Sequence, residues 1–389
     1  MQFLSCQYVY HLSKLFEKLL TNRLLPLLED LKTLPDHQFG FRKQHSTIER
    51  IHRITHSISQ TVEKKKYCSA VFLDIQQAFD KVWHEGLLYK LKKVLPHTYY
   101  SMLKSYLTNR QFMVKYADAI TTTFPIEAGI PQDSVLGPLL FSIYTADLPI
   151  STGIIIATFA DDTALLASHA NPTIALSTLQ QGLDSMEKWF HKWGFKINEK
   201  KSTHAAKTFT LPKQTCPQVT INDITVPNKD TVRYLYMTLD RRLTWKRHIV
   251  DKSKQLRDKL NKFYWLSGRR SNLSTQNKIM LYKIVIKPVW TYGIQLWGTA
   301  NNYNIEILQR FQSANKCFLL PNSVLINAPW YVTNETIHHN LKIPAVKDEI
   351  YKSRSRYNAR VSSHHNPFVT QLLNTTDQIR RLKRKYPLD

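Results

Sequence analysis

The sequence predicts an α+β fold that continues into a basic, mainly helical C-terminal region. Short apolar runs, among them Tyr67–Ile75 and Ile154–Phe159, have the length of buried strands, and aspartates lie at or just beyond their ends. Other segments repeat apolar residues at the three- and four-residue spacing of amphipathic helices. After Trp245 lysines and arginines become frequent on a helical pattern, which predicts that the C-terminal part is basic.

The composition favours a folded protein with a polyanionic partner. The chain has 389 residues, enough for two or more domains with sizeable cores. Hydrophobic residues make up 43% and charged residues 21%, close to the averages of globular proteins. Lys and Arg total 54 against 29 Asp and Glu, which gives a net charge of +25. Nucleic acid is therefore the first candidate partner, and an anionic membrane surface is the second.

Several classes of site are missing from the sequence. The ten glycines form neither the GxGxxG fingerprint of dinucleotide binding nor a Walker-type P-loop. The four cysteines include no C-x-x-C pair, so we expect neither structural zinc nor a disulfide framework. No apolar run approaches the ~20 residues of a membrane span, and Met1–Tyr10 lacks the basic start of a secretory signal. We therefore expect a soluble, intracellular protein without a membrane partner.

The N-terminal third predicts helices around one strand. An apolar stripe predicts a helix over Leu12–Leu28, which we interpret as core. Ser46 and Glu49 form a capping box that opens a second helix, and Lys64–Lys66 marks its exposed end. The strand Tyr67–Ile75 and a helix over Gln76–Lys93 follow.

The rest of the chain predicts a second strand pair, further helices and the basic region. The predicted elements are hairpin strands within Thr108–Gly129, a helix over Asp133–Ala146, the strands Ile154–Phe159 and Thr163–Ala167, a helix over Ile174–Trp193 that Gly194 ends, and strands at Thr208–Leu211 and Val219–Val226. A basic cluster at Arg380–Lys385 closes the chain.

Three aspartates are candidates for a metal site. Asp161 and Asp162 form the tip between two predicted strands, and Asp74 lies at the end of another. Like charges held close together repel unless a divalent cation neutralises them. Mg²⁺ prefers a few carboxylates together with substrate phosphate oxygens, so the trio fits a site with two metals over a phosphoryl group. The alternative is a solvated turn, which an isolated pair of aspartates usually forms.

Six ordered motifs favour the metal site over the solvated turn. They resemble the blocks of the reverse transcriptase of non-LTR retrotransposons and are most like those of the jockey-type mobile elements of animals. The motifs are QFGFRKQHST (Gln38–Thr47), LDIQQAFDKV (Leu73–Val82), GIPQDSVLGPLLF (Gly129–Phe141), FADD (Phe159–Asp162), INEKKS (Ile197–Ser202) and VRYLYMTLD (Val232–Asp240).

The resemblance implies a right-hand polymerase made of fingers, palm and thumb, with a helical basic C-terminal extension. It places truncated fingers at residues 1–66, the palm at 67–227, the thumb at 228–300 and the extension at 301–389, with a reverse transcriptase domain over about 12–240. The family's endonuclease and its first finger blocks have no counterpart before Leu12. The resemblance therefore implies a copy of a mobile element that is truncated at its 5′ end.

The resemblance also assigns the chemistry to particular residues. It implies a metal set of Asp74, Ile75, Asp161 and Asp162 that holds two Mg²⁺ ions, with Mn²⁺ as a substitute. One ion would lower the pKa of the primer 3′-hydroxyl, and the other would hold the triphosphate and stabilise the leaving pyrophosphate. Lys201 matches the lysine thought to protonate that pyrophosphate, and the neighbouring Lys200 is an alternative for the same role.

Three further residues are implied to bind the nucleotide. Phe79 would exclude a ribose 2′-hydroxyl and so select deoxynucleotides, with a core phenylalanine as the alternative. Arg42 suits a triphosphate clamp because guanidinium binds phosphate bidentately, although an ordinary surface arginine fits the sequence as well. Gln132 takes the glutamine position of the family's PQGS block, near the incoming nucleotide and the templating base.

Two positions depart from the family pattern. Asp133 stands where the family has glycine in PQGS, and Tyr236 replaces the glycine of the YLG run in the primer grip, which is implied to be Tyr234, Leu235 and Tyr236. Glycine at such positions permits a close approach of the backbone, so both departures bear on activity.

Three functions are therefore compared. The first is an RNA-directed DNA polymerase whose partners are an RNA template, a DNA primer and deoxynucleoside triphosphates, with a nuclear or cytoplasmic place implied by the family alone. The second is a decayed or repurposed polymerase fold that only binds RNA or DNA. The third is a basic membrane-associated protein, which the absence of an extended basic amphipathic helix disfavours.

Overall fold

The computed structural model describes most of the chain in two compact units. The described residues are 2–38, 40, 45–116, 119–131, 133–199, 202–205, 218–267, 271–319, 336, 339, 341–364 and 366–373. Unit 1 consists of Met1–Arg50 and Lys65–Lys229, and unit 2 of Ile51–Lys64 and Asp230–Asp389. The helix α2 (Thr47–Glu63) begins in unit 1, and from Ile51 onward it belongs to unit 2.

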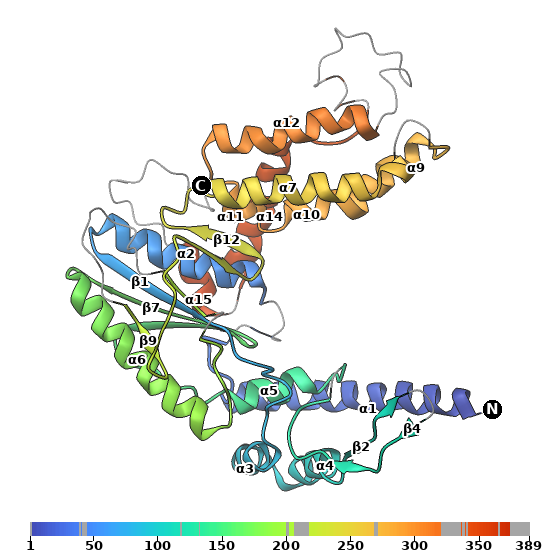
Figure 1. The fold of residues 1–389 in the computed structure, drawn as a ribbon, viewed down its shortest axis with the longest axis vertical. Coiled ribbons are helices and arrows are strands. Elements are labelled where there is room, and N and C mark those ends of the chain that lie inside the picture. The colour runs from blue at the N-terminus through green and yellow to red at the C-terminus, as the bar shows by residue number, and fades with distance from the viewer. Residues whose placement is uncertain are drawn as a thin grey trace. The chain divides into compact units, whose positions relative to one another are not determined.

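Unit 1 is built on one antiparallel sheet (Figure 1). Its strand order is β6 (Ile154–Phe159), β7 (Asp162–His169), β1 (Tyr67–Leu73) and β8 (Thr203–Ala205). After its first residue β1 is buried throughout, as expected for an inner strand that is apolar on both faces. Its last pair joins Leu73 to Thr163, so the next residues of β1 and β7 toward this end of the sheet are acidic.

Helices pack around this sheet and share its core. They are α1 (Gln2–Asp30), α3 (His84–Val94), α4 (His97–Leu107), α5 (Gly137–Tyr144) and α6 (Pro172–Lys192). In Figure 1, α6 runs along one face of β1 and β7, with the Asn171 side chain accepting a hydrogen bond from the Thr173 N–H at its start. Leu24, Leu87, Phe141 and Leu179 are buried members of one core cluster that joins these helices to the strands.

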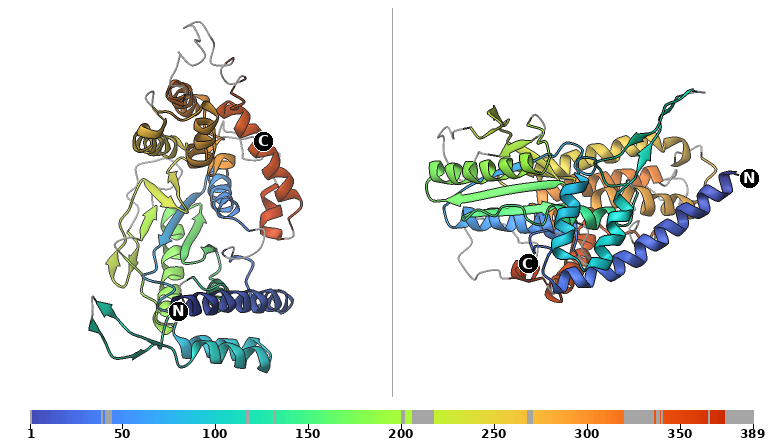
Figure 2. Two further views of the ribbon diagram at one scale, coloured as in Figure 1. Left: turned by 90° about the vertical axis from the view of Figure 1, so that its right-hand side faces the viewer. Right: turned by 90° about the horizontal axis from the view of Figure 1, so that it is seen from below.

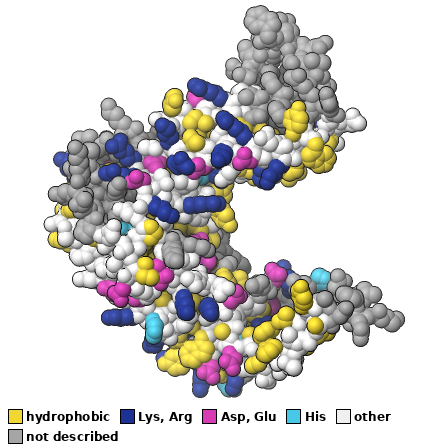
Figure 3. All heavy atoms as spheres, in the orientation of Figure 1, with side chains coloured by type: hydrophobic (Ala, Val, Ile, Leu, Met, Phe, Trp, Pro, Cys, Tyr) yellow, Lys and Arg dark blue, Asp and Glu magenta, His cyan; other side chains and the backbone are white. Residues whose placement is uncertain are grey.

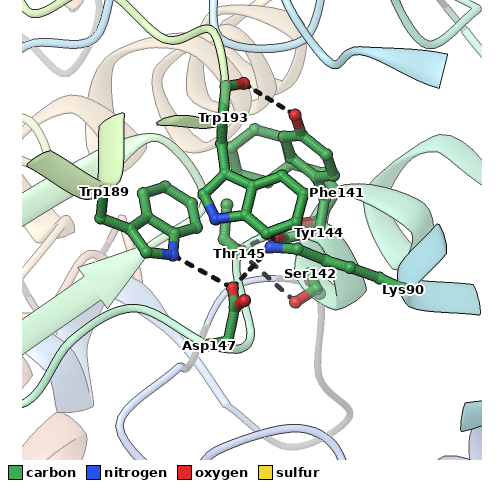
Figure 4. A network of polar contacts seen from close by, with 8 residues as sticks. All are labelled: Lys90, Phe141, Ser142, Tyr144, Thr145, Asp147, Trp189 and Trp193. Carbon is green, nitrogen blue, oxygen red and sulfur yellow. Dashed lines mark hydrogen bonds and ion pairs between the residues drawn. The ribbon is translucent and has the colours of Figure 1, made fainter. Parts of the chain in front are cut away.

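A buried lysine links three of these helices (Figure 4). The Lys90 ammonium lies 2.5 Å from both the Tyr144 carbonyl oxygen and the Asp147 carboxylate, and 3.5 Å from the centre of the Trp193 ring. Trp189 donates its indole N–H to the same carboxylate at 3.2 Å. Burial lowers the pKa of Lys90 to about 8, while the bond to Asp147 opposes that shift. The charge is therefore paired and surrounded by aromatic faces, which attract cations.

Short hairpins complete unit 1. In both views of Figure 2 an arm of two successive strand pairs projects from its helices. The arm pairs β2 (Gln111–Phe112) with β5 (Phe124–Pro125) and β3 (Lys115–Tyr116) with β4 (Ala119–Ile120), and a separate hairpin pairs β9 (Thr220–Ile221) with β10 (Ile224–Thr225).

Unit 2 is mainly helical. A hairpin of β11 (Thr231–Tyr234) and β12 (Met237–Asp240) leads into α7 (Lys246–Lys262), and the Asp240 carboxylate accepts hydrogen bonds from the Thr244 and Trp245 N–H groups before that helix. The later elements are α8 (Tyr264–Ser267), α9 (Thr275–Leu281), the π-helix η1 (Tyr282–Ile286), α10 (Lys287–Thr291), α11 (Ile294–Trp297), α12 (Asn302–Leu319), α14 (Val346–Ser362), α15 (Pro367–Thr370) and the 3₁₀-helix η2 (Gln371–Leu373).

The predicted α+β class and the helical basic C-terminal region are confirmed, and two helices were predicted to begin too early. The helix predicted from Gln76 starts at His84, because the Gln76 N–H donates to the Lys196 carbonyl and Gln77 has a positive φ of 47°. The helix predicted from Asp133 starts at Gly137, since Asp133 has a φ of 60°.

Other outcomes concern elements that were missed or cannot be compared. The helix α4 was not predicted, and α1 extends beyond the predicted ends of its helix. The predicted strand Thr208–Leu211 and the basic cluster Arg380–Lys385 lie outside the described residues. Among the helices that the structure describes, none is both long and apolar enough to cross a bilayer.

Candidate active site

The sheet of unit 1 brings the three predicted aspartates to one end. Phe159 pairs with Asp162 across the β6–β7 hairpin, so Ala160 and Asp161 form its two-residue loop. Because Leu73 pairs with Thr163, continuing the same register places Asp74 opposite Asp162. The acids from two distant motifs therefore share one edge.

The electrostatics of these acids reflect their proximity. Burial raises the pKa of Asp161 from its ordinary value, and the charge of Asp74 adds to the effect, while backbone hydrogen bonds oppose it. The pKa of Asp162 is raised to about 6 by partial loss of hydration and then by repulsion from Asp161 and Asp74. Repulsion among carboxylates is the signal of a site that gains from a bound cation.

The backbone of Asp74 is held in place by the INEKKS motif. Its N–H donates to the Ser202 hydroxyl at 3.1 Å, and its carbonyl accepts the Asn198 N–H at 2.8 Å. The Ser202 N–H in turn donates to the Asn198 carbonyl at 2.8 Å, which links the two residues that bond to Asp74. The motif therefore has a visible role in positioning the first acid.

Ile75 forms an isolated antiparallel bridge with Ile197. The hydrogen bonds of this bridge run between its neighbours, from Gln76 N–H to Lys196 and from Asn198 N–H to Asp74. In such a pair the N–H and C=O of the bridged residue point away from the partner strand. The Ile75 carbonyl oxygen therefore accepts no hydrogen bond from Ile197. A carbonyl that acts as a metal ligand, as predicted for Ile75, must point away from the partner strand in this way.

The donor chemistry of this edge suits a hard divalent cation, because carboxylates and a backbone carbonyl are the oxygen ligands that Mg²⁺ accepts. As the side chains are placed, no group of three His, Cys, Asp or Glu within the described part of the chain could by itself hold a metal ion.

Phe79 lies beyond the turn that follows Asp74 and is partly buried. Its ring stacks on Phe141 of α5, with centroids 4.7 Å apart and planes inclined by 18°. Its carbonyl accepts the Ile130 N–H at 3.0 Å. Phe79 is therefore both packed in the core and partly exposed. This position is compatible with a core phenylalanine and with a ring that excludes a ribose 2′-hydroxyl.

The segment before Arg42 lies against the aspartate hairpin. Gln38 forms a parallel bridge with Thr158, and a Cβ added at Gly40 would lie 2.4 Å from the Ala160 nitrogen, so only glycine fits there. This close approach connects the QFGFR motif to the FADD motif. The predicted nucleotide contacts Arg42 and Gln132, and the two lysines Lys200 and Lys201, lie outside the described residues.

Arg50 supports the same hairpin and was missed in the sequence analysis. Its fully buried guanidinium donates to the Thr158 carbonyl through Nε (3.1 Å) and Nη2 (2.8 Å), and also to the His37 carbonyl. The Thr158 hydroxyl donates to the same His37 oxygen at 3.2 Å. A signal was available, because Arg50 precedes Ile54 by one helical turn and so lies on the apolar face of α2.

The predicted primer-grip residues form the β11–β12 turn of unit 2. Tyr234 is buried, whereas Leu235 and Tyr236 have φ values of 44° and 62°, as in a type I′ turn. The Leu235 carbonyl accepts the Tyr292 hydroxyl at 2.8 Å, and the Arg233 guanidinium lies 5.6 Å from the ring centre of the exposed Tyr236.

Both departures from the family's glycines therefore occur at left-handed backbone positions. Asp133 and Tyr236 have φ values of 60° and 62°. Glycine adopts this conformation without strain, whereas a side chain at Cβ costs roughly 1–2 kcal/mol and aspartate is among the better tolerated residues. The family glycines at these positions therefore have two explanations, the close backbone approach that they permit and the positive φ that they adopt without strain.

The chain matches known proteins over most of its length. The family model described as "Reverse transcriptase (RNA-dependent DNA polymerase)" matches residues 6–239. The "Probable RNA-directed DNA polymerase from transposon X-element" of Drosophila melanogaster is 40% identical over 97% of this chain and 41% of its own length. The "RNA-directed DNA polymerase from mobile element jockey" of the same organism is 36% identical over 97% of this chain and 42% of its own length. The chain thus spans less than half the length of these relatives.

Among solved structures, a telomerase from Candida tropicalis in complex with an RNA fragment aligns with 96% of this chain and 59% of its own, at 11% identity and a TM-score of 0.46. The match to the family model includes all the motifs from Gln38 to within VRYLYMTLD.

Proposed function

The chain belongs to the reverse transcriptase (RNA-dependent DNA polymerase) family, as its motifs predicted, and from this premise we propose that it catalyses RNA-directed DNA synthesis. The proposal makes it a nucleotidyltransferase of a jockey-type non-LTR retrotransposon. The observation that carries it is the meeting of Asp74 with Asp161 and Asp162 at one edge of the sheet.

The reaction depends on metal ions that these residues would hold. Asp74, Asp161 and Asp162, with the Ile75 carbonyl, are the proposed ligands of two Mg²⁺ ions, and Mn²⁺ would serve as a substitute. When bound, the ions activate the primer 3′-hydroxyl and neutralise charge on the triphosphate. The chain itself contributes the alignment, because the sheet register and the bonds from Asn198 and Ser202 fix the backbone that presents the acids.

Other residues would select and hold the nucleotide. We propose Phe79 as the steric gate against a ribose 2′-hydroxyl, supported by its stacking on Phe141, which limits its freedom to move aside. Arg42, Gln132 and Lys201 keep their proposed roles in the triphosphate clamp, beside the templating base and in proton transfer to pyrophosphate.

Unit 2 supplies cationic surface for an RNA template and a DNA primer. Figure 3 shows Lys and Arg side chains gathered over α7. Six of its cations are exposed, namely Lys246, Arg247, Lys254, Arg257, Lys259 and Lys262. Side chains of this kind release counterions on binding phosphates, so affinity should fall steeply with added salt. We assign fingers to residues 1–66, palm to 67–227, thumb to 228–300 and the extension to 301–389.

A polymerase fold that only binds nucleic acid is the second candidate. The positive φ angles of Asp133 and Tyr236 favour it, because both positions carry a strain that glycine would remove. Under this candidate, wild type fails to extend primers and the double revertant Asp133→Gly with Tyr236→Gly regains extension.

Primer extension by the purified chain on an RNA template with Mg²⁺ tests the proposal. We expect deoxynucleotides to be incorporated by wild type and by Asp223→Asn, a matched control at an exposed aspartate of unit 1. No incorporation above background is expected for Asp161→Asn. Extension by that variant at the wild-type rate would contradict the assignment of Asp161.

A further inference from the structure

A buried glutamate of α1 contacts the loop that leads into α5. Glu17 is 5% exposed, whereas most of the apolar stripe that was predicted to be core lies on the exposed side of the helix, so that interpretation was wrong for Leu12, Leu15, Phe16 and Leu19. Its Oε2 accepts the Val135 N–H at 2.6 Å and the Ser134 hydroxyl at 3.0 Å, and its Oε1 accepts the Tyr106 hydroxyl at 2.9 Å. The carboxylate thus joins α1 to the GIPQDSVLG motif and to α4.

The contacts of Glu17 form a closed network. The Ser134 hydroxyl lies 3.0 Å from the Tyr106 hydroxyl and accepts the Leu136 and Gly137 N–H groups at 3.1 and 3.0 Å. A negative charge is favourable here, because the N–H groups at the start of a helix carry partial positive charge. Removing the carboxylate would leave buried donors without an acceptor, which costs far more than a solvent-exposed hydrogen bond.

The same loop and helix are fixed to Phe79 on their other side. The Ile130 N–H donates to the Phe79 carbonyl at 3.0 Å, and Phe141 of α5 stacks on the Phe79 ring. A Cβ added at Gly129 would lie 3.2 Å from the Asp80 carbonyl oxygen, so this end of the loop also lies close to the chain that carries Phe79. Glu17 and Phe79 are therefore connected through one loop and one short helix.

We propose that Glu17 is a positioning residue for nucleotide selection: by anchoring the start of α5 it holds Phe141 against Phe79 and keeps the gate in place. The inference rests on the proposed polymerase function and extends it to a helix outside the aspartate edge. Glu17 touches neither the nucleotide nor the metals in this account, and it acts through the ring that Phe141 supports.

The ratio of deoxynucleotide to ribonucleotide incorporation is the decisive readout, because this ratio does not depend on the fraction of active protein. We expect Glu17→Ala to lower the ratio about tenfold. Glu17→Gln should stay close to wild type, since its amide can keep an acceptor toward Ser134 and Val135 and donate toward Tyr106. Glu29→Ala, at an exposed glutamate of the same helix, is the matched control and should change nothing.

A double-mutant cycle distinguishes positioning from general damage. If Glu17 acts through Phe79, then Glu17→Ala should not lower the ratio further in a Phe79→Ala background. An equal additional loss in that background would overturn the inference, as would an unchanged ratio for Glu17→Ala alone. If Glu17→Ala fails to fold, Ser134→Ala is the second variant: it removes the hydroxyl that contacts Glu17 and accepts the Leu136 and Gly137 N–H groups, and it should lower the ratio in the same direction.

Hydrogen exchange separates this inference from the proposed activity. We expect Glu17→Ala, and not Glu29→Ala, to speed exchange in peptides that contain Val135 and Leu136. If wild type extends no primers, the proposed function is wrong, but the exchange measurement still tests whether Glu17 anchors the start of α5. Unchanged exchange in the Val135 peptide would contradict the anchoring role whatever the activity.

Discussion

Unit 1 and unit 2 differ in the charges that they bury. In unit 1 the pKa values of Asp161 and Asp162 are raised because carboxylates lose hydration and lie near one another. In unit 2 burial lowers the pKa of both His52 and His248 to about 3, so the imidazoles are neutral, and the lysines and arginines of α7 are mostly exposed.

The difference indicates which charges are structural and which are functional. A neutral buried histidine, such as His52 with its ring nitrogen 2.9 Å from the Tyr357 hydroxyl, is compatible with a stable core. A group of acids with raised pKa values opposes stability, and such groups are typical of functional sites. Repulsion among the aspartates at the end of the sheet therefore lowers the stability of unit 1, whereas the neutral histidines of unit 2 carry no charge that repels a neighbour.

The largest expected effect is a separation of activity from stability in unit 1. Asp161→Asn should lower the rate of primer extension by about a thousandfold or more, because it removes a metal ligand. The same change should raise the melting temperature measured without metal, since it relieves repulsion from Asp74 and Asp162. A variant that is both inactive and less stable would show that Asp161 has a structural role. That result would contradict the inference that the acids of unit 1 are functional and oppose its stability.

Sugar selection should depend on one ring of unit 1. Phe79→Ala should lower the preference for deoxynucleotides over ribonucleotides about tenfold or more, because the space opposite the 2′-hydroxyl opens. Competition assays on one RNA template measure the ratio, with the choice of base unchanged. If the variant stays active with the wild-type ratio, Phe79 is a core residue only.

Acid should weaken unit 2 through its histidines. The folded-state pKa of His52, about 3, lies below its ordinary value of 6.5, so its contribution to stability is complete above pH 6.5 and is lost as the pH falls toward 3. Hydrogen exchange of peptides from unit 2 should show this loss, and His52→Gln should reduce it. His204, with a pKa lowered to about 4, gives unit 1 a similar dependence. An acid response of unit 2 that His52→Gln and His248→Gln leave intact would rule out this cause.

The smallest effects concern the two strained positions, one in each unit. Tyr236→Gly should raise the free energy of unfolding of unit 2 by about 1 kcal/mol, because glycine adopts a positive φ without strain. Asp133→Gly should stabilise unit 1 by less, since aspartate tolerates this conformation better than tyrosine. Urea denaturation measures both, and destabilisation by Tyr236→Gly would mean that its contact with Arg233 outweighs the strain.

Sequence patterns predicted the elements whose apolar residues determine them. The strands β1 and β6 and the helices α2, α6 and α7 follow from period and capping, and the hydrogen bond from the Ser46 N–H to Glu49 at 2.5 Å agrees with the predicted capping box. The meeting of Asp74 with Asp162 could be expected only through the family resemblance, because strand register depends on pairing between distant segments.

The supporting residues were missed, although the position of Arg50 on the apolar face of α2 gave a signal. Arg50 and Glu17 are charged residues on amphipathic helices, where a charge usually indicates the solvent face. Their burial depends on acceptors and donors from distant segments, such as the Thr158 carbonyl and the Val135 N–H. The turn after Asp74 was taken for a helix because its pairing with Lys196 has no local signal.

Metal-dependent stabilisation tests most directly whether Asp74, Asp161 and Asp162 form one cation site. Millimolar Mg²⁺ should raise the melting temperature of wild-type unit 1 by about 3 °C or more, because a ligand that binds only the folded state stabilises it. Asp74→Asn and Asp161→Asn should each lose this shift, while Asp223→Asn should keep it at the same ionic strength. Equal shifts in wild type and in both site variants, or no shift in wild type, would contradict the account.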